Sequence, residues 1–85
     1  MSDKLYETRD LALAAALVTL GYSPKALIHW KDKTFTFQMD MAFNDGKALE
    51  QKYYALLLEV PAKTFTDTIR KIRSMVHDET KRLGL

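Results

Sequence analysis

A row of nitrogen-bearing side chains near the carboxyl end is the arrangement in this sequence best suited to binding a charged ligand. Its members are Arg70, Arg73, His77 and Lys81. The spacing is three, four and four residues, so on a helix these side chains share one face. Such a row can follow the phosphate backbone of a nucleic acid. The other interpretation is a solvated helix surface whose last basic residues complement the negative end of the helix dipole.

The distribution of charge along the chain says more about a nucleic-acid partner than the net charge does. The 85-residue chain carries a net charge of +2 at pH 7, which is too small to imply a polyanionic partner by itself. From residue 69 onward, however, five basic residues stand against only Asp78 and Glu79. Nucleic acid is therefore a possible partner that composition alone does not establish.

Catalytic chemistry has little support in the residue types present. The chain has no cysteine, which excludes thiol chemistry, and His29 and His77 alone cannot form a structural zinc site. Its three glycines are far apart, so there is no glycine-rich phosphate loop. The segment from Asp40 resembles a calcium loop but has Gln51 where the twelfth ligand, a glutamate, belongs. We expect no catalytic residue, no metal and no cofactor.

Length and composition indicate one globular domain over residues 1–85, with residues 1–5 flexible. Asp3, Glu7 and Asp10 are acidic residues in a region that a signal peptide would keep basic. The apolar run over residues 11–18 is about half the ~20 residues that a membrane span needs. The absence of cysteine fits a reducing compartment. We therefore expect a cytoplasmic protein without a membrane partner.

The first expected helix has an unusually small polar face. Thr8 is a suitable N-cap, the helix runs to about Leu20, and Gly21 supplies the left-handed residue that ends it. Because leucine and alanine cover most of its sides, the helix should be central in the domain.

Residues 26–41 predict a β-hairpin, because apolar and polar residues alternate in its second strand. The register that gathers large apolar side chains on one face pairs Trp30 with Phe35 and Ile28 with Phe37. It leaves residues 31–34 as a four-residue loop.

Two further helices follow the hairpin. The first is capped by Asn44 or Asp45 and covers residues 47–58, although residues 53–60 could also form a strand. The last begins at Pro61, ends at Gly84 and buries one stripe. That stripe consists of Phe65, Ile69, Ile72, Val76 and Leu83. The expected fold is α+β in the order α-β-β-α-α, with a two-stranded antiparallel hairpin packed on three helices.

A two-stranded hairpin leaves open edges, which suggests self-association. A homodimer could form through the second strand, at Thr34, Thr36 and Gln38, or through the small-residue face of the first helix, at Ala12 and Ala16.

The residues near the N-terminus also carry a resemblance. They read Tyr6-x-Thr8-x-Asp10-Leu11-x-Leu13-Ala14, followed by Leu17, Leu20, Gly21 and Tyr22. This motif resembles a family of short bacterial and phage proteins classed as a domain of unknown function. The resemblance implies a small cytoplasmic protein often encoded near mobile elements, and it brings no activity, ligand or catalytic residue.

The function expected from the sequence is a non-catalytic interaction module that binds a protein partner or a second copy of itself. The alternative is a small nucleic-acid-binding regulator. The alternative gains if Arg70, Arg73 and Lys81 stand unpaired on one exposed face, and it loses if Asp67, Asp78 or Glu79 neutralise them.

Overall fold

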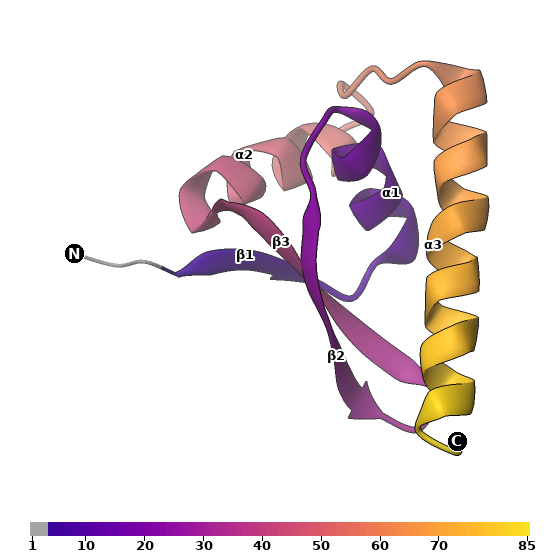
Figure 1. The fold of residues 1–85 in the computed structure, drawn as a ribbon. Coiled ribbons are helices and arrows are strands. Elements are labelled where there is room, and N and C mark those ends of the chain that lie inside the picture. Colours follow the sequence, from indigo (N-terminus) through magenta and orange to yellow (C-terminus); the bar gives the residue numbers. More distant parts are fainter. Residues whose placement is uncertain (1–3) are drawn as a thin grey trace.

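The computed structural model describes residues 4–85, which form a three-stranded antiparallel sheet and three helices (Figure 1). In chain order the elements are β1 (Leu5–Thr8), α1 (Leu11–Thr19), β2 (Pro24–Lys31), β3 (Thr34–Ala42), α2 (Phe43–Tyr54) and α3 (Ala62–Arg82). The expected α+β class is confirmed. The expected order and the two-stranded hairpin are wrong, because a short strand precedes α1 and makes the order β-α-β-β-α-α.

Strand β1 lies against β3, so the strand order in the sheet is β1-β3-β2 and β3 is central. Its Tyr6 is 1% exposed and belongs to the core. Of the residues expected to be flexible, 1–3 lie outside the described part of the chain, whereas Leu5 is the first residue of β1. Four residues directly before a strong helix are too few to show the strand's alternation.

Helix α1 is the centre of the domain, as expected. Leu13, Ala14, Ala15 and Leu17 are buried, and the core joins α1 to side chains from β1, β3 and α3. α3 lies along α1 and contacts chiefly that helix (Figure 1). Because α1 is covered by the sheet and by α3, small and apolar residues suit most of its surface.

The predicted N-cap of α1 is wrong, and the predicted glycine at its C-terminal end is confirmed. At its start the N-cap is Asp10, whose Oδ1 accepts the Leu13 N–H at 3.1 Å; Thr8 ends β1 and accepts the Asp10 N–H. At its end Gly21 has φ +106° and the Tyr22 N–H donates to the Leu17 carbonyl at 3.1 Å, so the predicted left-handed glycine cap is confirmed.

The predicted hairpin register is wrong by one residue. Ile28 lies opposite Thr36 and His29 opposite Phe35, so Leu27 rather than Ile28 pairs with Phe37. The register shifts by one residue near each end of β2, and the connecting turn is tighter than the four-residue loop that was expected. Tyr6 of β1 supplies aromatic volume to the core, and Trp30 lies 53% exposed.

Helix α2 starts immediately after β3. The break expected at Asn44 and Asp45 is wrong, because both residues lie in the first turn of this helix. Its fourth residue, Gly46, is buried against the ring of Tyr6. The helix ends at Tyr54, and the segment that joins it to α3 is neither the predicted helix nor the alternative strand.

Helix α3 covers 21 residues and packs by one side only. Thr68 and Ile72 are buried, and Phe65, Ile69 and Val76 pack partly against the core. Leu83, expected in the buried stripe, is 40% exposed because it lies beyond the last helical turn. None of the helices in residues 4–85 combines the length and apolarity required to span a bilayer.

Candidate nucleic-acid interface

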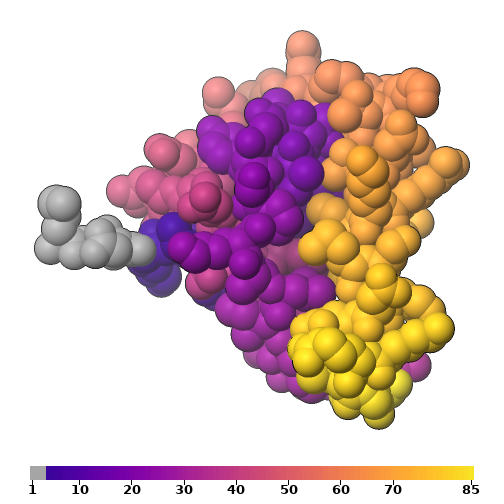
Figure 2. Space-filling view, in the orientation of Figure 1, coloured from indigo at the N-terminus to yellow at the C-terminus, as the bar shows by residue number. Residues whose placement is uncertain are grey.

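The row predicted from spacing lies on α3, on the side turned away from the core. Arg70, Arg73, His77 and Lys81, hereafter the cationic row, are all exposed. At 1.5 Å rise per residue, the row extends over about 16 Å of helix. The space-filling view shows α3, coloured orange to yellow, as one flank of the molecule (Figure 2). A ligand can therefore approach the row without displacing any other element.

The carboxylates of α3 that form ion pairs do so with other cations. Asp67 lies 3.4 Å from Lys63, and Glu79 accepts two hydrogen bonds of 2.7 Å from Arg82. The bonds from Arg82 hold the pKa of Glu79 below its ordinary value. Within residues 4–85, no ion pair or hydrogen bond engages the side chains of the cationic row.

This arrangement leaves the charges of the cationic row uncompensated by direct partners. Arginine presents a planar fork of donors that matches phosphate geometry, and lysine acts as a point charge. Side chains spaced along one solvent face suit a backbone of regularly spaced anions.

A second group with binding potential lies on the open face of the sheet. The guanidinium of Arg9 stands 4.2 Å from the centre of the Trp30 ring, and the Lys31 ammonium stands 5.4 Å from it. A hollow of about 430 Å³ opens beside them, and Glu7 and Glu50 also line it. Sequence reasoning missed this group because it placed Trp30 in the core. The two carboxylates make it a poorer site for a polyanion than the cationic row.

The residues proposed for self-association do not form one surface. Thr34, Thr36 and Gln38 belong to β3, which pairs with β2 along one edge. Along the other edge β1 pairs with β3 from Phe37 to Ala42, so Gln38 is covered on both sides and Thr34 and Thr36 on one side only. Ala16 is 1% exposed and Ala12 is half-buried on α1. Self-association through these residues stays a prediction.

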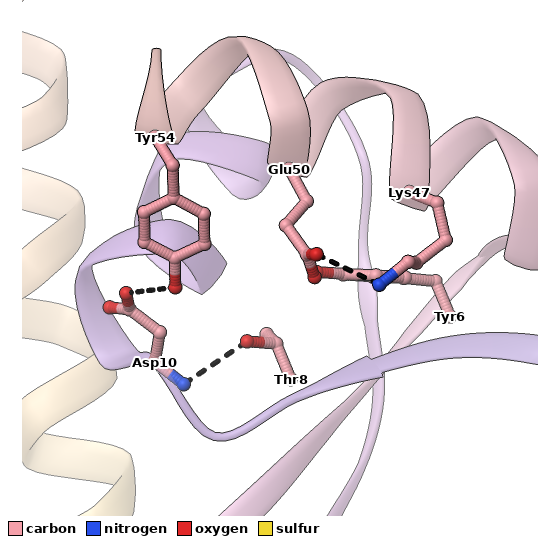
Figure 3. Close-up of polar contacts among 6 residues, drawn as sticks. All are labelled: Tyr6, Thr8, Asp10, Lys47, Glu50 and Tyr54. Carbon is pink, nitrogen blue, oxygen red and sulfur yellow. Dashed lines mark hydrogen bonds and ion pairs between the residues drawn. The ribbon is translucent and has the colours of Figure 1, made fainter. Parts of the chain in front are cut away.

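Two tyrosine–carboxylate pairs connect α2 to β1 and α1 (Figure 3). The Tyr6 hydroxyl donates to Glu50 Oε1 at 2.5 Å, and Lys47 Nζ lies 2.8 Å from Oε2 of the same carboxylate. The pKa of Glu50 is lowered chiefly by the bond from Lys47 and secondly by the bond from Tyr6. Burial, followed by the bond to Glu50, raises the pKa of Tyr6. These contacts join α2 to β1.

The second pair ties the last turn of α2 to the start of α1. The Tyr54 hydroxyl donates to Asp10 Oδ2 at 2.7 Å. This bond first, and burial and the nearby negative charges after it, raise the pKa of Tyr54 to about 12. The other oxygen of Asp10 caps α1. The Asp10 carboxylate therefore joins the end of α2 to the start of α1.

Neither histidine belongs to a cluster with metal-binding potential. His29 Nε2 lies 2.7 Å from the carbonyl oxygen of Asp32, and the ring stands 5.5 Å from that of Phe35. His77 lies in the cationic row on α3. Over residues 4–85, no three His, Asp or Glu side chains gather where they could hold a metal ion.

Comparison with models of protein families found no match, and comparisons with curated proteins and with solved structures found none either.

Proposed function

We propose that this chain is a small non-catalytic module that binds nucleic acid, contacting the phosphates of a duplex with the outer side of α3. The observation that carries the proposal is the cationic row, exposed along one helix and without a carboxylate partner among residues 4–85. A cytoplasmic location and a phage or mobile-element origin, which the N-terminal resemblance implies, belong to the same proposal.

A duplex is favoured over a single strand by the shape of the surface. α3 is an uninterrupted helix of 21 residues, about 30 Å long, and α1 is the element of residues 4–85 that it contacts most. The major groove of B-DNA is about 12 Å wide and admits a helix of this kind. The row carries no exposed aromatic side chain on which unstacked bases could lie, which single-strand binding commonly uses.

The proposal is tested by fluorescence anisotropy of a labelled DNA duplex titrated with the protein at several salt concentrations. Affinity should be measurable at about 50 mM salt and should fall as salt rises, because binding releases counterions from the phosphates. Arg70→Ala and Arg73→Ala should each reduce the slope of log K against log salt by about 0.9.

Lys71→Ala is the matched control, since Lys71 is an exposed cation on α3 outside the cationic row. It removes the same charge and should change the slope far less. Equal effects of Lys71→Ala and Arg73→Ala would reduce the binding to general charge attraction and refute a specific interface. No binding at about 50 mM salt would remove the proposal altogether.

Protein binding is the second candidate. Its support is a different surface, the exposed leucines after α2.

A further inference from the structure

The three helices end with the same backbone motif, but one of them uses an unusual residue. In α1 and α3 the left-handed position is occupied by Gly21 and Gly84, with φ of +106° and +73°. In α2 it is occupied by Leu56, with φ +61°. The Leu56 N–H donates to the Tyr53 carbonyl at 3.1 Å and the Leu57 N–H to the Lys52 carbonyl at 2.8 Å, which is the bonding pattern of a glycine cap.

Leu56 is unfavourable for the single chain in two ways. A side chain in the left-handed region is strained, which is why glycine normally takes this position. The residue is also 91% exposed, and its neighbour Leu57 is 72% exposed. Neither residue gains burial in return. Local strain combined with exposed apolar surface is expected where a chain binds a partner.

An apolar hollow of about 380 Å³ lies beside this leucine turn (Leu56 and Leu57). Leu56 forms part of its wall, whereas Leu57 does not line it. The other lining residues are Ala16, Tyr53, Tyr54, Leu58, Val60 and Phe65. The surface therefore presents the exposed Leu57 and, next to it in the chain, Leu56 in the wall of the hollow. Both residues belong to the segment that connects α2 to α3 at one end of the molecule (Figure 1).

The leucine turn is also held in a defined position. Tyr54, directly before it, is bonded through its hydroxyl to Asp10, which is fixed at the start of α1 (Figure 3). A surface that is ordered before binding loses less conformational entropy on association.

We propose that the leucine turn is the contact surface of a homodimer, in which Leu57 of each copy enters the hollow of the other. A two-fold interface requires one patch to carry both complementary shapes, and this patch does. Two exposed residues of opposite charge, Lys52 and Glu59, also flank the leucine turn in the sequence. A two-fold axis can place each against its opposite in the second copy.

The exposed apolar side chains of the turn are of the kind that a small dimer interface buries. The weaker specific interfaces bury on the order of 500 Å² from each partner. Tyr54, Leu56 and Leu57 are each more than half exposed, and the walls of the hollow add to their apolar area. The proposal is independent of nucleic-acid binding, since the cationic row lies on the opposite side of α3 from Phe65.

Sedimentation equilibrium over a concentration series tests the proposal. The unaltered chain should sediment as a dimer at high micromolar concentration, and Leu57→Ser should raise the dissociation constant at least tenfold. Leu85→Ser is the matched control, because Leu85 is exposed at the far end of α3 and should leave the dimer intact. Circular dichroism checks that each variant is folded.

Leu56→Gly separates a binding role from a structural one. It should weaken the dimer while raising the thermal midpoint of the dilute monomer, because it relieves the left-handed strain. A monomer at every concentration, or a dimer that Leu57→Ser leaves unchanged, would overturn the proposal. So would a monomer whose hollow binds a small apolar dye, since the hollow would then be a ligand site.

Discussion

Gly46→Ala provides the sharpest test of how α2 sits on the sheet, because two principles predict opposite signs for it. Alanine favours the helix interior over glycine by about 1 kcal/mol, so helix propensity predicts stabilisation. In the structure, however, Gly46 is buried, and an added Cβ would overlap the Cβ and ring atoms of Tyr6. The structure therefore predicts destabilisation.

The size of the effect follows from which atoms collide. Because the Tyr6 Cβ is itself among the overlapped atoms, rotating the ring cannot remove the clash, and β1 must separate from α2. Tyr6 is 1% exposed and bonded to Glu50, so such a shift also disturbs the core and that bond. Overpacking costs about 1–3 kcal/mol, and a clash that ring rotation cannot relieve belongs at the upper end of that range. With the propensity gain of about 1 kcal/mol subtracted, we expect a net loss of about 2 kcal/mol.

Urea unfolding and thermal melts measure this loss. For a domain of this size, 2 kcal/mol lowers the midpoint by roughly 8–16 °C. Asn44→Ala is the control, since Asn44 is exposed in the same helical turn and its replacement should be neutral or slightly stabilising. If Gly46→Ala raised the midpoint as Asn44→Ala does, α2 could not pack on Tyr6 as described.

Two further predictions concern the caps of α1 and the response to acid. Gly21→Ala should cost about 1 kcal/mol through its left-handed backbone alone, since nothing lies within 4 Å of the added Cβ. Asp10→Ala should cost more than Gly21→Ala, because it removes both the N-cap and the bond from Tyr54, and melts compare both variants with the unaltered chain. The lowered pKa of Glu50 stabilises the fold above the ordinary carboxyl range, and this contribution is lost as pH falls through the lower folded-state pKa. Glu50→Gln should therefore lower the free energy of unfolding near neutral pH and flatten its decrease on acidification, as measured by urea titration at each pH; an unchanged pH profile would contradict the role given to Glu50.

The features predicted correctly from the sequence are those that depend only on residues close to one another in the chain. Gly21 and Gly84 end their helices because the left-handed position favours glycine whatever surrounds it. The spacing of Arg70, Arg73, His77 and Lys81 determines that they share one side of α3, since a long amphipathic helix buries its other side.

Long-range pairing accounts for the errors in the sheet. Strand β1 exists because β3 pairs with it, and four residues give no periodic signal of their own. The hairpin register was derived from the assumption that Trp30 must be buried. With Tyr6 of β1 supplying aromatic volume to the core, Trp30 can lie on the open face beneath Arg9.

Whether nearby carboxylates neutralise the cationic row could not be predicted from the sequence. Asp67 and Asp78 each lie close enough along α3 to neutralise a member of the cationic row. Whether a carboxylate does so depends on side-chain conformation, and Asp67 turns to Lys63 instead. Spacing along the helix shows which residues can form ion pairs, and only the three-dimensional structure shows which of them do.

The leucine turn differs from the other two helix ends in the residue that it uses. The chain uses glycine at the ends of α1 and α3, so the motif is available to it, yet α2 ends with a strained and exposed leucine. A glycine there would relieve the left-handed strain in the single chain, and contact with a second copy is the explanation that we propose for the leucine. Two copies joined at this turn would each keep the outer side of α3 exposed. Their cationic rows could then contact one duplex together, with the second contact favoured by the high effective concentration that follows the first.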